Sequence, residues 1–142
     1  MTKIEMVNPD PSQAEFMPYA PAVKAKGGGE MIFISGATAS PLYHSHPHVP
    51  EEHIHDDDIA AQTRKCMENI KLVLDHEGLT WRHVVNVVKY LTDMREADEM
   101  HAVMGEYLGD WKPASTLLCV NNLSSPGARL ELTMQAFKPD GG

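Results

Sequence analysis

The segment from Ala128 to Phe137 constrains the fold most strongly, because apolar and polar side chains alternate along it. Glu131 is one of its polar residues. The apolar residues at every second position are Ala128, Leu130, Leu132, Met134 and Ala136. Alternation with a period of two is typical of a β-strand with one buried face. The strand holds the Glu131 carboxylate on a rigid element, where it either lies in solvent or lines a cleft and transfers protons.

The remaining periodicities predict one α+β domain over residues 1–142. Further strands are expected at residues 19–26, 30–35, 84–91 and 115–121, and helical spacing is found over 59–74 and 100–108. The order is ββαβαββ, with a hairpin at each end, which predicts one mixed sheet with two helices packed on one face. Residues 1–17 are expected to be a loosely ordered lead-in, and residues 37–57 a long loop rich in proline and histidine.

Composition excludes several functional classes. The formal charge is −8 and no lysine or arginine cluster occurs, which argues against nucleic-acid binding. No apolar run is long enough to cross a bilayer, and the first residues lack the apolar core of a secretion signal. Two cysteines, Cys66 and Cys119, are expected to be small buried side chains in a reducing compartment. We therefore expect a cytoplasmic protein that binds neither membranes nor nucleic acid.

The strands at 30–35 and 84–91 are apolar on both faces. Two helices cover only one face of a sheet, so the other face must pack against something else. We therefore expect an oligomer in which the uncovered faces form shared clefts.

Six short motifs occur in an order and spacing similar to those of the Rid (YjgF) family of reactive-intermediate deaminases. The motifs are Met17–Val23, Phe33–Gly36, Gln62–Arg64 with Asn69 and Ile70, Val87–Met94, Lys112–Ala114 and Leu130–Leu132. The resemblance covers about residues 19–139. It implies a chorismate-mutase-like homotrimer with active sites at the subunit interfaces. It also implies hydrolysis of enamines or imines to ketones and ammonia, without a metal or a cofactor.

The resemblance assigns candidate site residues position by position. Glu131 resembles the family glutamate that positions and activates the hydrolytic water. Tyr19 and Ser35 resemble residues that contact the substrate.

Three positions depart from the family pattern. Ser115 replaces the arginine that is expected to clamp a substrate carboxylate, and serine supplies neither a charge nor a bidentate donor. Leu117 replaces a cysteine, and His101 falls near a pocket asparagine. These changes argue against the usual imines derived from amino acids.

The loop at 37–57 carries five of the eight histidines of the chain, which are His44, His46, His48, His53 and His55. Three interpretations stay open. The histidines bind a borderline metal ion such as Zn²⁺, or they cover the cleft and replace the lost arginine, or they are solvated and offset the neighbouring acids. An extended segment would direct His46 away from His44 and His48, and Pro47 would stiffen it, so no metal is assigned.

Together these observations predict a hydrolytic deaminase, or a related hydrolase, that acts on a small conjugated catabolic intermediate with water activated by Glu131. The alternative is a non-catalytic trimer of the same fold that binds a small molecule or has a regulatory role. A ribonuclease activity is disfavoured by the negative charge.

Overall fold

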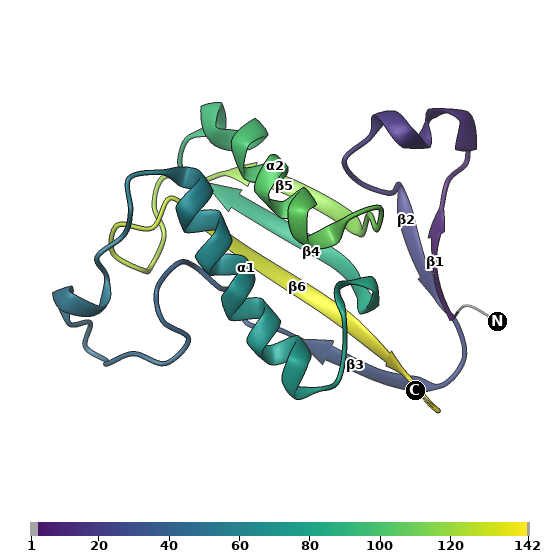
Figure 1. Ribbon diagram of the computed structural model, residues 1–142, viewed down its shortest axis with the longest axis horizontal. Coiled ribbons are helices and arrows are strands. Elements are labelled where there is room, and N and C mark those ends of the chain that lie inside the picture. The colour runs from purple at the N-terminus through teal and green to yellow at the C-terminus, as the bar shows by residue number, and fades with distance from the viewer. Residues whose placement is uncertain (1–2, 142) are drawn as a thin grey trace.

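The computed structural model describes residues 3–141, and its core is a four-stranded mixed sheet in the order β3-β6-β4-β5. The strands are β3 (Gly29–Phe33), β4 (Val84–Leu91), β5 (Ala114–Cys119) and β6 (Leu130–Pro139). Strand β4 runs parallel to β5 and antiparallel to β6. Helices α1 (Ile59–His76) and α2 (Ala97–Leu108) cross the same face of this sheet (Figure 1). The predicted fold class, α+β with a mixed sheet, is confirmed.

Strand β6 lies in the interior of the sheet and has the alternation that its sequence predicts. Leu130, Leu132 and Met134 are fully buried, whereas Glu131 and Thr133 between them are only partly buried. The buried side chains pack with Met67 and other residues of the two helices into one hydrophobic core. Burial of this apolar face supplies the main driving force for folding.

Both helices have a recognisable residue at one end. The carboxylate of Asp58 accepts a hydrogen bond from the backbone N–H of Ala60 and so caps the start of α1. Helix α2 ends at Gly109, whose φ of +61° is a conformation that favours glycine. Within residues 3–141, no helix is both long enough and apolar enough to cross a membrane.

The prediction of a loosely ordered lead-in at residues 1–17 is wrong for the part of it that the structure describes. Strand β1 (Ile4–Val7) pairs with β2 (Ala22–Ala25) in a separate two-stranded sheet, and a 3₁₀-helix, Pro11–Phe16, connects them. Ile4 is buried against Trp111 and Phe137, and this contact anchors the segment. Residues 1 and 2 lie outside the described part of the chain.

Both predicted hairpins are also wrong. Strand β2 pairs with β1 and not with β3, and β5 pairs in parallel with β4 and not with β6. Strand β6 instead lies between β3 and β4 (Figure 1). A period-two pattern identifies a strand, but it does not identify the neighbour that satisfies the backbone hydrogen bonds of that strand.

The alternation on β6 leads to a prediction about stability. We expect Met134→Ala to lower the free energy of unfolding by about 3 kcal/mol, because it removes a fully buried side chain and leaves a cavity. The neighbouring change Thr133→Ala, on the other face, should cost less than about 1 kcal/mol. Urea denaturation of the two variants measures the difference, and equal losses would contradict the assignment of faces.

Candidate active site

The predicted site residues lie on both faces of the main sheet. Residues paired in register on adjacent strands share a face, and side chains alternate along each strand. Glu131 of β6 pairs with Tyr90 of β4, whereas Leu132 pairs with Lys89 and Lys89 pairs with Leu117 of β5. Glu131 therefore points away from the helices. Lys89, Leu117 and, two residues earlier on β5, Ser115 point toward them.

The carboxylate of Glu131 packs against the backbone of Gly36. An isolated bridge between Ala37 and Leu132 brings this segment beside β6, with Ala37 N–H donating to the Leu132 carbonyl at 2.8 Å. A β-carbon at residue 36 would lie 2.9 Å from the Glu131 carboxyl carbon, so a larger residue at this position would displace the carboxylate from its present rotamer. Ser35 is adjacent in sequence and, with Gly36 and residues of α1, lines a cavity of about 390 Å³, but Glu131 is not among the residues that line this cavity.

Partial burial raises the pKa of Glu131 above that of an exposed glutamate, because the charged form loses hydration. A carboxylate with a raised pKa is a better proton acceptor than a fully solvated one. On this face of the sheet, a candidate general base therefore lies against the backbone of Gly36.

A second cavity, of about 170 Å³, lies under α2 on the helix-covered face of the sheet. Its lining includes Lys89, His101, Ser115 and Trp111. The Lys89 side chain is buried, with 3% of the residue exposed, and its Nζ lies 2.7 Å from His101 Nε2. An ammonium group only donates hydrogen bonds, so when Lys89 is charged, Nε2 of His101 accepts and the imidazole is neutral.

Burial shifts both groups toward their neutral forms. Loss of hydration lowers the pKa of Lys89 to about 8. The pKa of His101 is lowered first by burial and second by the charge of Lys89. Near pH 7 the pair therefore carries one positive charge, on Lys89, inside a small cavity.

Sequence reasoning missed Lys89, although a signal was present. Val87, Lys89 and Leu91 occupy alternate positions of β4, so a lysine stands in a row of buried apolar residues. Lysine is seldom fully buried without a partner. Its position in this row therefore marks it as a functional candidate.

The other predicted residues have separate surroundings. Tyr19 is 38% exposed, and its neighbour Pro18 lines the Lys89 cavity. Leu117 packs at the margin of the hydrophobic core. Cys66 is buried as predicted, but the prediction for Cys119 is wrong, because this residue lies exposed at the end of β5.

The loop histidines contact one another. Ligand nitrogens of His44, His46 and His48 lie within 4.8 Å of each other. The expectation that His46 points away from its neighbours is therefore wrong, because the chain bends at residues 46 and 47 and is not extended there. His53 is buried and its Nδ1 is 2.8 Å from Ser40 Oγ, whereas His55 Nε2 is 3.4 Å from the same hydroxyl.

Comparison with known proteins identifies the family. The family model described as endoribonuclease L-PSP matches residues 12–138. The chain belongs to this family, the Rid (YjgF) family. A RutC family protein of Pyrococcus horikoshii is 38% identical over 85% of this chain and 87% of its own length. The 3-aminoacrylate deaminase RutC of Acinetobacter baylyi is 29% identical over 93% of this chain and 96% of its own length.

Solved structures agree with the family assignment. A YjgF family member from Mycobacterium tuberculosis is 27% identical with a TM-score of 0.61, over 94% of this chain and 98% of its own. A Rid protein from Yersinia pestis has a TM-score of 0.75 at 23% identity, over 96% and 99% of the two chains, and supports the shared fold. The Rid fold predicted from the motifs is thus confirmed.

The buried amine of Lys89 leads to a prediction about pH dependence. Its pKa is about 8 in the folded protein and about 10.4 when unfolded, so between these values the unfolded chain holds more protons. The free energy of unfolding of the wild type should therefore rise with pH relative to that of Lys89→Met. We expect Lys89→Met to be more stable by about 1–2 kcal/mol at pH 7, with the difference shrinking by pH 10.

Urea denaturation at pH 7, 8.5 and 10 measures this difference. Lys65→Met is the matched control, because it makes the same change at an exposed position of α1. The control difference should not vary with pH. A constant difference for Lys89→Met as well would contradict the lowered pKa.

Proposed function

We propose that the protein hydrolyses the C=N bond of a small anionic imine, or of the enamine that tautomerises to it, and releases ammonia. The observation that carries the proposal is the partly buried Glu131 carboxylate against Gly36, on a chain of the Rid family. A relative of nearly the same length is a 3-aminoacrylate deaminase, which acts on an enamine that bears a carboxylate.

Glu131 acts as the general base of this reaction. It takes one proton from a water molecule while the water oxygen bonds to the imine carbon and the C=N electron pair moves to nitrogen. That proton is returned to nitrogen to give the neutral carbinolamine. The hydroxyl proton of the carbinolamine is then transferred to nitrogen as the C–N bond breaks, so that ammonia leaves and the carbonyl forms. The sum is one imine and one water converted to one ketone or aldehyde and one ammonia, with no external oxidant or reductant.

Lys89 supplies the cation that Ser115 does not. The resemblance predicts that an arginine at position 115 would bind the substrate carboxylate, and Lys89 and His101 line the same cavity as Ser115. A buried ammonium attracts an anion more strongly than an exposed one, because water screens it less. The lysine ammonium is a point charge, whereas the arginine guanidinium is planar and donates two parallel hydrogen bonds to a carboxylate. The two side chains therefore favour substrate carboxylates in different orientations.

Glu131 and Lys89 face opposite sides of one sheet, so the complete site requires two subunits. The face that bears Glu131 also exposes Phe33, Met31 and Leu118, of which Phe33 is 71% exposed. Apolar side chains of this size favour burial against a second copy of the chain. We propose a homotrimer in which the Glu131 face of one subunit closes over the Lys89 cavity of its neighbour.

Ribonuclease activity fits the chain poorly, although the family description names an endoribonuclease. The net charge is −8, and phosphate backbones are bound chiefly through lysine and arginine.

Tyr19 and Ser35 are proposed to contact the small substrate and to exclude water from it.

Glu131→Gln tests the proposed function, because the amide has the shape of the carboxylate but does not accept the proton. We expect kcat for ammonia release to fall about 10²–10⁴-fold on a panel of small imine and enamine acids that includes 3-aminoacrylate and 2-aminoacrylate. The oligomeric state and the binding of the product acid should be retained.

Two controls complete the test. Glu77→Gln makes the same change at a residue outside the proposed site and should leave kcat unchanged. If the wild type releases no ammonia from any member of the panel but still binds product acids, the protein is a binding trimer that has lost the chemistry. If Glu131→Gln retains full turnover, the proposed role of Glu131 is wrong.

A further inference from the structure

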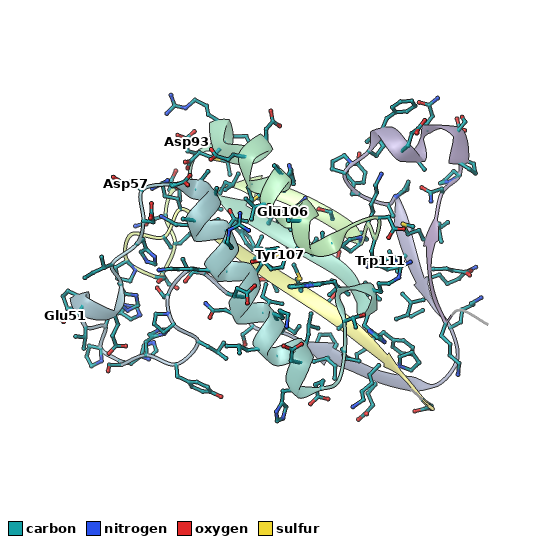
Figure 2. All side chains as sticks on the ribbon, in the orientation of Figure 1. Glu51, Asp57, Asp93, Glu106, Tyr107 and Trp111 are labelled. Atoms are coloured by element: carbon teal, nitrogen blue, oxygen red, sulfur yellow. The ribbon has the colours of Figure 1, made fainter. Side chains whose placement is uncertain are left out.

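The side chains of His44, His46 and His48 form a cluster apart from the cavity that contains Lys89. Ring centroids are 4.7 Å apart for His44 and His46, 5.0 Å for His46 and His48, and 5.5 Å for His44 and His48. Glu51 of the same loop and Trp111, which lines the Lys89 cavity, lie at opposite sides of the molecule (Figure 2). The cluster therefore does not line that cavity within the same chain.

We propose that His44, His46 and His48 bind one divalent transition-metal ion of the zinc class, and that the ion holds the loop from Pro41 to His53 in one conformation. Imidazole is a preferred ligand for Zn²⁺ and similar borderline metals. Three imidazoles supply three of four tetrahedral positions and leave one for water or a small ligand. The ion is structural in this proposal and takes no part in the deamination.

The distances permit such a site with small side-chain movements. Nitrogens that bind Zn²⁺ at about 2.0–2.1 Å in a tetrahedron lie about 3.4 Å from each other. The three histidine nitrogens already lie within 4.8 Å of one another. Rotation about side-chain torsions can close the remaining gap of about 1.4 Å or less, because the cluster is at the surface and His46 is exposed.

A hydrogen bond outside the cluster prepares His44 as a ligand. Its Nδ1 lies 2.8 Å from the carbonyl oxygen of Pro41. A carbonyl only accepts, so Nδ1 carries the proton and Nε2 keeps a free lone pair. Metal-binding histidines generally donate their second ring nitrogen in this way, which fixes the tautomer and the ring orientation.

The loop is also held by Glu52. The backbone N–H and the hydroxyl of Ser45, which lies between two of the proposed ligands, each donate to this carboxylate at 2.8 Å. These two hydrogen bonds join residue 45 to residue 52 and so hold in place the part of the loop that carries His44, His46 and His48. The histidines are thus brought together by protein contacts before any ion binds, which lowers the entropic cost of binding.

His53 adds an independent observation that points to a ligand at this place. Its ring packs 4.6 Å from that of His48 and 5.1 Å from that of His44. Its Nε2 is buried and has no hydrogen-bond partner among the described residues, although such groups are nearly always paired. A water molecule on the metal would supply that partner. We therefore assign His53 to the surroundings of the ion and not to the ligand set.

Local charge favours a cation. Residues 37–58 contain five acidic side chains and no lysine or arginine. The negative charge of the loop thus attracts a divalent cation, and no lysine or arginine of the loop opposes it.

Calorimetric titration of the untagged, metal-free protein with Zn²⁺ tests the proposal. We expect one ion per chain with a dissociation constant on the order of 1 µM or tighter. Separate titration with Co²⁺ should give the visible absorption bands of a tetrahedral site. His46→Ala and His48→Ala should each weaken Zn²⁺ binding at least about tenfold and abolish those bands. Zn²⁺ should also slow proteolytic cleavage within the loop of the wild type.

The matched control is His76→Ala, which removes an exposed histidine from α1 outside the cluster and should bind Zn²⁺ as the wild type does. Circular dichroism establishes that each variant is folded. Non-saturable binding, or equal affinity in His46→Ala, His48→Ala and the control, would mean adventitious binding only and would overturn the proposal. Deamination by the metal-free wild type tests the proposed function separately, because the ion is not part of that chemistry.

Discussion

The interior strand β6 decides where the chemistry of this protein can take place. Its alternate side chains are divided between a buried face, with Leu130, Leu132 and Met134, and an opposite face that presents Glu131. Hydrophobic burial holds the strand in its register, since a slip of one residue would place all of its apolar side chains on the wrong face. The face of the sheet on which Glu131 lies is therefore fixed by the hydrophobic core.

The register of β6 also determines the face to which the side chains of β4 point. Lys89 of β4 is paired with Leu132 and so enters the helix-covered side, where it meets His101 of α2 at 2.7 Å. The carboxylate and the buried amine are separated by the sheet within one chain. A reaction that needs both groups must combine faces from two copies. The exposed Phe33 and its neighbours on the Glu131 face favour that arrangement energetically.

The sequence predicted what depends on local pattern. The bounds of β4, the buried face of β6 and the positions of both helices follow from periodicity, which is a property of short segments. The pairing of the strands could not be predicted from local pattern, because β5 joins β4 and β2 joins β1 through contacts between distant segments. For the same reason the lead-in was misjudged, since the burial of Ile4 depends on Trp111 and Phe137.

The candidate site was predictable only in part. Glu131, His101 and Ser115 came from motif resemblance. The structure adds the close approach of Gly36 and the burial of Lys89, to which the resemblance assigned no role. The gathering of His44, His46 and His48 could not be read from their spacing, because it depends on bends in the loop and on the bonds from Ser45 to Glu52. Loop conformation is set by such individual contacts and not by periodicity.

Activity of mixed oligomers tests most directly whether Glu131 and Lys89 of different subunits form one site. Glu131→Gln and Lys89→Met would be refolded separately and as an equimolar mixture, and ammonia release would be measured at substrate concentrations below KM. In the mixture, a site with Glu131 from one variant and Lys89 from the other is intact. We expect low activity for each variant alone and recovery of up to about a quarter of the wild-type rate in the mixture. Mixed oligomers that form but regain no activity would contradict it.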